Sequence, residues 1–217
     1  VSMARPMLAD PEWVNKARDG REDQINTCIA CNQACLDHTF GGYKQVSCLV
    51  NPRACAETEL NYTKTDSPKR IAVVGAGPAG LACATVAAQR GHQVTLFDAS
   101  PKIGGQFNLA KKIPGKEEFY ETLRYFGRQL ELHKVEQRLG IRVEAEALKD
   151  FDEVVLATGI TPRKISFPGI DHAKICSYID VLTGKVIPGK KVAVIGAGGI
   201  GFDISEYLIH DGESSTL

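Results

Sequence analysis

The pattern of hydrophobic residues changes near residue 70. From Arg70 onward, short and continuously apolar runs alternate with a helical pattern, in the order IAVVG, LACATVAAQRG and QVTLFD. Continuous apolar runs of this length are typical of parallel strands that are buried on both faces, and the middle run fits a helix that ends at Gly91. The pattern predicts a βαβ unit and hence an α/β fold.

A longer helix is predicted from Glu117 to Leu139, because apolar residues recur there at helical spacing. These residues are Phe119, Leu123, Phe126 and Leu130. We interpret their aromatic members as core residues and not as ligand contacts.

A second α/β pattern follows the helix. FDEVVLATG predicts a buried strand that ends at Thr158-Gly159, and ITPRKISFPG, with its two prolines, predicts a crossover between domains. KKVAVIGAGGIGFDISEYLIHDG then repeats the strand, glycine turn and helix, but no second strand follows before Leu217. Because a βαβ unit needs that strand, we expect the sequence to be part of a longer enzyme.

The residues before position 70 show little periodicity. Residues 1–9 predict the end of a strand, Asp10 and Pro11 the start of a helix, and Gly20 its end. Between Arg21 and Thr65 the chain has neither a helical nor an alternating pattern, as expected where metal ligation organises the segment in place of a core.

That segment contains four cysteines at the spacing C-x2-C-x3-C-x12-C, namely Cys28, Cys31, Cys35 and Cys48. Thiolates are soft ligands, so this set can hold an iron–sulfur cluster or a tetrahedral zinc ion, and spacing alone does not decide between them. Three closely spaced thiolates with one distant thiolate favour the cluster, because structural zinc more often uses two separated C-x2-C pairs.

The other three cysteines argue against a disulfide framework. Seven cysteines is an odd number, and no signal peptide precedes them. Cys83 falls on the predicted helix after the glycine turn and fits a small buried thiol, while Cys55 is a weaker alternative ligand.

Composition excludes several classes of function. The chain has 217 residues, 43% of them hydrophobic, and 26 basic residues balance 26 acidic ones. No net field therefore attracts nucleic acid or an anionic membrane, and no apolar run is long enough to span a bilayer. Because reduced thiols are needed at the cysteine site, we expect a cytoplasmic protein with no nucleic acid or membrane partner.

The first glycine turn has the form G-x-G-x-x-G at Gly75, Gly77 and Gly80. In this motif the first glycine permits a tight turn, the second lets a pyrophosphate approach the backbone, and the third lets helix and strand pack closely. Asp98, at the end of the next strand, is placed to accept hydrogen bonds from a ribose. The context predicts a dinucleotide site.

A second turn of the same form occurs at Gly196, Gly198 and Gly201, without a ribose-binding residue after it. Two such turns about 120 residues apart are expected where an NAD(P)H-binding domain is inserted into an FAD-binding domain. On this basis the first turn holds FAD and the second holds the nicotinamide dinucleotide.

A family resemblance runs through four segments: CIACNQACLDHTF, SCLVNPRAC, IGGQFNLAKKIPGKEEF and VAVIGAGGIGFD. Together they resemble the C-terminal half of bacterial NADPH-dependent 2,4-dienoyl-CoA reductase, an iron–sulfur flavoenzyme of the old yellow enzyme and trimethylamine dehydrogenase group. The likeness covers essentially the whole chain, and VSMARPMLADP resembles the end of the family's FMN-binding (β/α)8 barrel.

The resemblance implies a division into four parts. Residues 1–22 would end the barrel, 23–67 would form the iron–sulfur segment, 68–164 a Rossmann-like FAD domain, and 165–217 the start of an inserted NAD(P)-binding Rossmann domain. Residues 140–152 are shorter than the family pattern gives, which puts one strand of the FAD domain in doubt.

The resemblance also implies cofactor sites. It assigns a 4Fe-4S cluster to the four cysteines, FAD to the first glycine turn with Asp98, and NADPH to the second turn. Further flavin contacts are implied at Gly104, Gly105, Gln106, Thr158 and Gly159. Arg5 matches a position near the FMN phosphate, although an ordinary surface arginine fits that position as well.

The implied reaction passes hydride from NADPH to FAD and single electrons through the cluster to FMN, which reduces a dienoyl-CoA in the oxidation of unsaturated fatty acids. The catalytic acid and the acyl-CoA pocket belong to the barrel, so the catalytic residues are unknown from this sequence, and we expect the 217 residues alone to be inactive. Two alternatives are a related ene-reductase or amine dehydrogenase, and a zinc-stabilised nucleotide-binding module. The sequence does not determine the oligomeric state.

Overall fold

The structure is a computed structural model that describes residues 3–42, 44–163 and 165–212. It divides into two compact units, which we describe separately. The first consists of residues 1–105 and 118–159, and the second of residues 106–117 and 160–217. No helix in the described ranges combines the length and the apolar character that a membrane crossing requires.

The first unit is built on a parallel four-stranded sheet with the strand order β3-β2-β1-β4. Its strands are β1 (Arg70–Val74), β2 (Gln93–Asp98), β3 (Glu136–Leu139) and β4 (Glu153–Leu156). Strand β1 lies between β2 and β4, with Val73 opposite Leu96 on one side and Val155 on the other. The predicted parallel α/β fold is therefore confirmed. The strand predicted in FDEVVLATG forms as β4, but it ends at Leu156 and is not buried as predicted, because it lies at the edge of the sheet with Val154 and Leu156 exposed.

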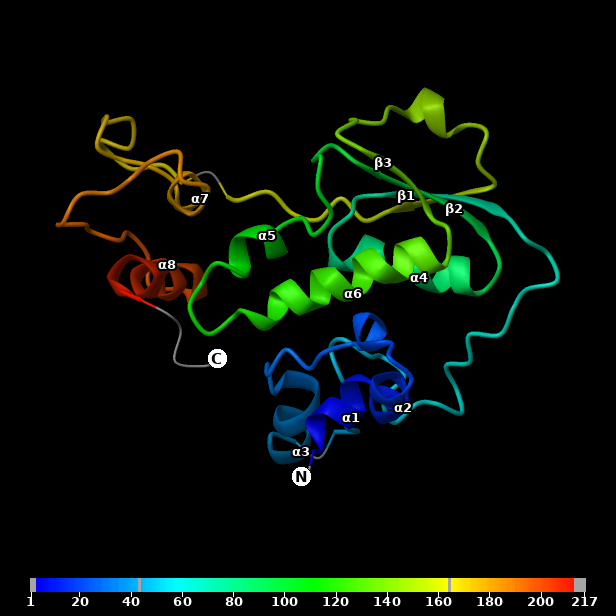
Figure 1. Cartoon of the computed structure of the whole chain (residues 1–217). Helices are drawn as coiled ribbons and strands as arrows, with labels where there is room; N and C mark the ends of the chain where they lie inside the picture. Colours follow the sequence, from blue (N-terminus) through cyan, green and yellow to red (C-terminus); the bar gives the residue numbers. More distant parts are fainter. Residues whose placement is uncertain (1–2, 43, 164, 213–217) are drawn as a thin grey trace. The chain divides into compact units, whose positions relative to one another are not determined.

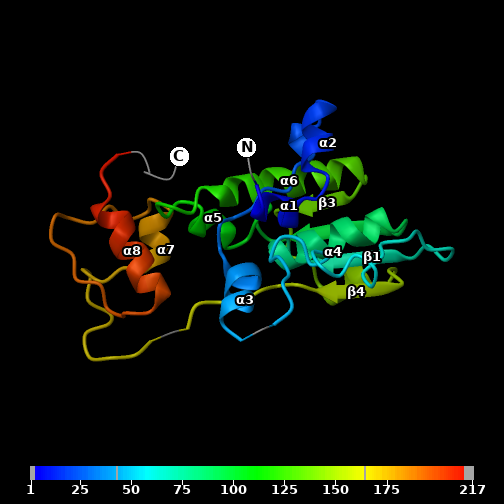
Figure 2. The same cartoon turned by 90° about the horizontal axis from the view of Figure 1, so that it is seen from below.

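Two helices cover one face of this sheet (Figure 1 and Figure 2). They are α4 (Pro78–Gln89) and α6 (Glu118–Leu132). The core between helices and sheet includes Leu81, Leu96 and Leu130, none of which is exposed. Full burial of such a side chain contributes about 1.5–3 kcal/mol to the free energy of folding. These contacts therefore stabilise the part of the sheet that carries the glycine turn.

The predicted helix from Glu117 to Leu139 is confirmed over Glu118–Leu132 and wrong beyond Leu132. Helix α6 ends at Leu132, Lys134 adopts a left-handed conformation with φ 55°, and strand β3 follows at Glu136–Leu139. Three of the four β3 residues are polar and exposed, so the strand has no hydrophobic signature. It is formed by pairing with β2 and by a hydrogen bond of 3.0 Å from Thr95 Oγ1 to Glu136 Oε2. The following residues, 140–152, contain the 3-10 helix η3 (Ala145–Leu148) and no strand.

The N-terminal part of the first unit consists of short helices and turns. Its elements are α1 (Arg5–Ala9), α2 (Trp13–Arg18), η1 (Glu22–Gln24), the π-helical turn η2 (Gln33–Asp37) and α3 (His38–Phe40). The strand end predicted for residues 1–9 is wrong over residues 5–9, which are helical, and Val1 and Ser2 lie outside the described residues. The predicted helix start at Asp10 and Pro11 is wrong by about two residues, because α2 begins at Trp13 with Glu12 as its N-cap. Asp10 lies in the turn before the helix, where its Oδ1 accepts a hydrogen bond of 3.0 Å from the amide of Glu12.

The second unit is smaller, and its described residues form three helices, α5 (Phe107–Ala110), α7 (Tyr178–Leu182) and α8 (Gly199–Ile209). Its core consists of Ile113, Val181, Leu182 and Ile204. The strand predicted before the second glycine turn is not formed, and Val192, Val194 and Ile195 are exposed. A strand requires a hydrogen-bonded neighbour, and the described part of this unit contains none.

Candidate functional site

The first glycine turn connects β1 to α4, and two of its glycines are required by the fold itself. Gly75 has φ 112°, and a Cβ atom on it would lie 2.2 Å from the carbonyl oxygen of Ala157. A Cβ on Gly80 would lie 1.8 Å from the carbonyl oxygen of Gly75. No side chain fits at either distance, so these positions bring strand and helix together as the motif predicts.

The middle glycine is different. Gly77 has an ordinary extended backbone (φ −76°, ψ 178°), and a Cβ on it would meet nothing within 4 Å. The fold therefore does not require a glycine at this position. The open space beside the N-terminus of α4 is where a pyrophosphate would approach the backbone, and the helix N-terminus favours negative charge there. Because of this open space, the turn fits a dinucleotide.

Several predicted flavin contacts surround this turn. Gly104 donates its amide to the carbonyl of Ala76 at 2.7 Å, and a Cβ on Gly105 would lie 3.1 Å from the Cα of Gly77. The amide nitrogen of Thr158 lies 3.1 Å from the Cβ position of Gly75. Gly159, which follows, has φ 70°. Four of the five implied contacts thus lie within the first unit, near the ends of β1 and β4.

Asp98 also lies at the turn. Its Oδ2 accepts a hydrogen bond of 2.6 Å from the amide of Ala76, and its Oδ1 accepts one of 2.7 Å from the amide of Ser100. Each carboxylate oxygen has a second lone pair, so the side chain retains the capacity to accept from a ribose hydroxyl. The two amides fix its orientation beside the turn.

The second glycine turn repeats this geometry within the second unit. Gly196 has φ 121°, a Cβ on Gly201 would lie 2.2 Å from the carbonyl oxygen of Gly196, and a Cβ on Gly198 would meet nothing within 4 Å. Helix α8 begins directly after it. Gln106 belongs to this unit, where its Nε2 donates to the carbonyl of Ile160 at 2.9 Å.

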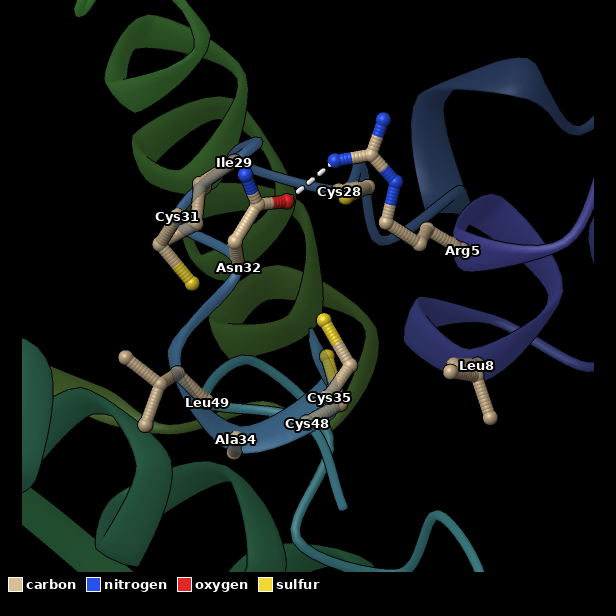
Figure 3. Close-up of a pocket in the computed structure, with 10 residues that line it drawn as sticks. All are labelled: Arg5, Leu8, Cys28, Ile29, Cys31, Asn32, Ala34, Cys35, Cys48 and Leu49. Atoms are coloured by element: carbon tan, nitrogen blue, oxygen red, sulfur yellow. Dashed lines mark hydrogen bonds between the residues drawn. The ribbon is translucent and has the colours of Figure 1, made fainter. Parts of the chain in front are cut away.

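The four predicted cysteine ligands line a single pocket in the first unit (Figure 3). Its other lining residues are Arg5, Leu8, Ile29, Asn32, Ala34 and Leu49. In Figure 3 the sulfur atoms of Cys31, Cys35 and Cys48 point into a shared space. The loop that carries Cys48 therefore returns to the segment that carries the other three.

The backbone around these cysteines adopts unusual conformations. Ala30 and Asn32 have φ values of 53° and 57°, which side-chain-bearing residues rarely adopt, and they flank Cys31. The π-helical turn η2 follows and contains Cys35. Left-handed alanine and π-helical turns cost free energy and tend to occur at functional sites. Here they turn successive cysteines toward one pocket.

The thiols share the pocket without converging on one point. Among the described residues, no group of three or more cysteine, histidine, aspartate or glutamate side chains is placed to hold a single metal ion. A zinc ion requires four sulfurs at about 2.3 Å from one centre, whereas in a 4Fe-4S cluster each cysteine binds a different iron atom. Four thiols that line one pocket are a donor set that fits a 4Fe-4S cluster.

Cys48 is half-buried, and this burial raises the pKa of its thiol, while the amides of Val50 and Asn51 oppose the rise by donating to the sulfur. Amides that donate to a cysteine sulfur also stabilise its thiolate once a metal is bound. Cys55 does not line the pocket: it is exposed with φ 62°, and its carbonyl accepts from Gln45 Nε2 at 2.6 Å.

A buried polar network holds the two cysteine-bearing segments together. Asp10, only 4% exposed, accepts hydrogen bonds from Lys16 Nζ at 2.6 Å and from the amide of Asn26 at 2.9 Å. Asn26 in turn donates to the carbonyl of Val50 at 2.7 Å, and Asn51 donates to the carbonyl of Leu8 at 2.8 Å. The network thus reaches residues two positions from Cys28 and from Cys48.

Substitution of Asp10 by alanine is expected to lower the free energy of unfolding of the first unit by about 3 kcal/mol. The change leaves the Lys16 ammonium, whose side chain is 17% exposed, without its buried partner. Urea denaturation followed by circular dichroism measures the effect. Asp19→Ala is the control, because it removes only exposed ion pairs, with Arg18 and Arg21, and should change little. Equal effects of the two substitutions would contradict the role of the network.

Helix α6 holds the same segment through Arg124. Its guanidinium donates to the carbonyls of Glu22, Asp23 and Ile25, at 2.9 Å for Ile25. The 3-10 helix η1 packs against α6. Because the sheet packs on the other side of α6, this contact links the cysteine segment to the dinucleotide-binding fold.

Arg124→Ala is therefore expected to increase local opening of residues 22–31. Loss of charge-assisted hydrogen bonds costs about 2 kcal/mol, or about thirtyfold in the opening equilibrium. Hydrogen–deuterium exchange read by mass spectrometry measures this. Arg142→Ala is the control, since the Arg142 side chain is 87% exposed. Unchanged exchange in residues 22–31 of the Arg124 variant would show that α6 does not hold the segment.

The sequence matches the pyridine nucleotide-disulphide oxidoreductase family over residues 69–217, a range that includes both glycine turns. The chain belongs to this family. Curated relatives include a metal reductase of Desulforamulus reducens, 40% identical over 98% of this chain and 32% of the relative, and a cinnamate reductase of Clostridium sporogenes, 34% identical over 100% of this chain and 32% of the relative. The chain thus spans about a third of the length of these relatives.

A solved structure of 2-naphthoyl-CoA reductase with 2-naphthoyl-CoA is also similar, with a TM-score of 0.89 and 38% identity over 95% of this chain and 32% of that one. An alkene reductase and demethylase of the old yellow enzyme type from Caballeronia cordobensis is 32% identical over 93% of this chain and 29% of the relative. These likenesses confirm the flavoenzyme group expected from the sequence. The dienoyl-CoA reductase itself remains a prediction.

Sequence reasoning missed three residues of this oxidoreductase's cysteine site. Asn32 lines the pocket, Asn26 joins the two segments, and Arg124 comes from a helix about 100 residues away. The only signal available was the position of Asn32 directly after Cys31, since asparagine tolerates the left-handed conformation. Arg5, expected near the FMN phosphate, lines the same pocket.

Proposed function

We propose that this chain is the electron-input part of an NADPH-dependent iron–sulfur flavoprotein. The proposal assigns FAD to Gly75, Gly77, Gly80 and Asp98, NADPH to Gly196, Gly198 and Gly201, and a 4Fe-4S cluster to the four cysteines. When bound, these groups would together convert a two-electron hydride donor into a source of single electrons. The observation that carries the proposal is that the four cysteines share one pocket in the same unit as the first glycine turn.

The residues of this chain would bind and orient these groups. The amides at the start of α4 would hold the pyrophosphate of FAD, with Asp98 accepting from its ribose. The contact from Arg124 to the cysteine segment would keep the cluster at a fixed distance from the flavin. Apolar neighbours of the cysteines, Leu8, Ile29 and Leu49, would exclude water from the sulfurs.

For the complete enzyme we propose reduction of a 2,4-dienoyl-CoA at an FMN site in a (β/α)8 barrel, in the oxidation of unsaturated fatty acids in the cytoplasm. The likeness to 2-naphthoyl-CoA reductase supports an unsaturated acyl-CoA as the electron acceptor. A second candidate is a related amine dehydrogenase, because a dimethylamine dehydrogenase of Hyphomicrobium is 32% identical over 90% of this chain. The two candidates differ in the direction of electron flow between substrate and nicotinamide.

An anaerobic reduction experiment tests this function. NADPH added to the complete enzyme, loaded with FAD, FMN, iron and sulfide, should bleach the flavin absorbance and produce the electron paramagnetic resonance (EPR) signal of a reduced 4Fe-4S cluster. A 2,4-dienoyl-CoA added afterwards should restore the flavin absorbance, whereas dimethylamine should not. Bleaching by dimethylamine, with none by NADPH, would favour the amine dehydrogenase. The absence of any cluster signal would contradict the proposed relay.

A further inference from the structure

Among the ten described residues that line the cysteine pocket, Arg5 is the only charged one. It is the first residue of α1, and one terminal nitrogen of its guanidinium donates a hydrogen bond to Asn32 Oδ1 (Figure 3). The two residues are 27 positions apart in the sequence. A fixed positive charge therefore lies beside four thiols.

The partner of Arg5 is itself part of the ligand segment. Asn32 follows Cys31 directly, has φ 57°, and accepts at its carbonyl a hydrogen bond of 2.9 Å from the amide of Asp37 that closes the π-helical turn. The turn contains Cys35. The hydrogen bond from Arg5 thus restrains the residue that leads the chain from one cysteine to the next.

A positive charge at this place has a defined effect on a cluster. Four thiolates and the inorganic core carry net negative charge, and reduction adds one more electron. A nearby cation stabilises the more negative state, so it raises the reduction potential, which net charge and local hydrogen bonds are known to set. Arg5 is exposed in this structure, so solvent screening limits the effect to a modest one.

The geometry points to Arg5 as a residue that raises the reduction potential of the cluster through its charge and positions Cys31 and Cys35 through Asn32. This inference rests on the proposed function, because it requires a cluster on the four cysteines. It differs from the FMN-phosphate contact expected for Arg5 from the sequence. The two roles predict different losses when the residue is changed.

The test compares Arg5→Gln, Arg5→Lys and Asn32→Gly in the complete protein by EPR-monitored redox titration. Arg18→Gln is the control, since Arg18 is an exposed arginine that does not line the pocket. Iron, acid-labile sulfide and FMN are quantified first for every variant. Glycine at position 32 keeps the left-handed backbone accessible while it removes the Oδ1 that holds Arg5.

Arg5→Gln should keep the cluster but shift its one-electron reduction equilibrium toward the oxidised form by about threefold to tenfold, which is about 30 to 60 mV at 59 mV per tenfold. Arg5→Lys should retain most of the wild-type reduction potential, and Arg18→Gln should match the wild type. The reduction potential of Asn32→Gly should lie between those of the wild type and of Arg5→Gln. A loaded Arg5→Gln protein with wild-type potential would overturn the inference, whether or not FMN is lost. If the wild type itself holds no iron and sulfide, the proposed function fails first.

Discussion

Replacement of Gly77 by valine is expected to abolish FAD binding while the protein remains folded. A Cβ at this position meets nothing within 4 Å, and the backbone conformation suits any residue. The added side chain would instead occupy the space where the pyrophosphate must approach the start of α4. We expect FAD affinity to fall by about a hundredfold or more, which is about 2.8 kcal/mol. Fluorescence of the flavin released from purified protein measures the remaining FAD.

Two matched substitutions control this experiment. Gly80→Ala should lower the free energy of unfolding by about 3 kcal/mol, because its Cβ would lie 1.8 Å from the carbonyl oxygen of Gly75. Gly198→Val, the counterpart in the second turn, should keep FAD and lose binding of the nicotinamide dinucleotide. If Gly77→Val kept full FAD and only raised the Michaelis constant for NADPH, the two turns would have to exchange their cofactors.

Replacement of Cys48 by serine is expected to prevent assembly of a complete 4Fe-4S cluster. The hydroxyl of serine is a poor ligand for iron in place of a thiolate, and the other three cysteines come from a single short segment that cannot supply a fourth. Iron content should fall well below four per chain, and the visible absorbance of the cluster should be lost. The same result is expected for Cys28, Cys31 and Cys35.

Cys55→Ser separates this prediction from a general effect of losing a cysteine. Cys55 is exposed and lies outside the pocket, so this variant should retain its iron and sulfide in full. A complete cluster in Cys48→Ser together with a lost cluster in Cys55→Ser would show that Cys55 is the fourth ligand.

The sequence predicts a strand well when the strand's own side chains are apolar and become buried. Strands β1 and β2 are continuous apolar runs because both faces of a central parallel strand are covered. Strand β3 lies at the edge of the sheet and consists mainly of polar residues, so only its pairing with β2 reveals it. The strand expected at Val192–Ile195 shows the opposite failure, since an apolar run without a hydrogen-bonded neighbour stays irregular.

The same distinction applies to the site. Cysteine spacing and glycine spacing are local properties of the sequence. The structure brings the predicted cysteines into one pocket, and it places Gly75, Gly77 and Gly80 in one turn. The contacts that support them join distant positions: Arg124 reaches Ile25, and Arg5 reaches Asn32. Arginine and asparagine are common surface residues, so a single sequence gives no reason to pair Arg124 with Ile25 or Arg5 with Asn32.

The most direct test of the account is the metal and sulfide content of the protein after anaerobic reconstitution, measured together with its EPR spectrum. The account predicts about four irons and four acid-labile sulfides per chain, no stoichiometric zinc, and a signal that appears on reduction. About one zinc per chain with no sulfide and no EPR signal would contradict it, and would identify the cysteine pocket as a structural zinc site beside a dinucleotide-binding fold.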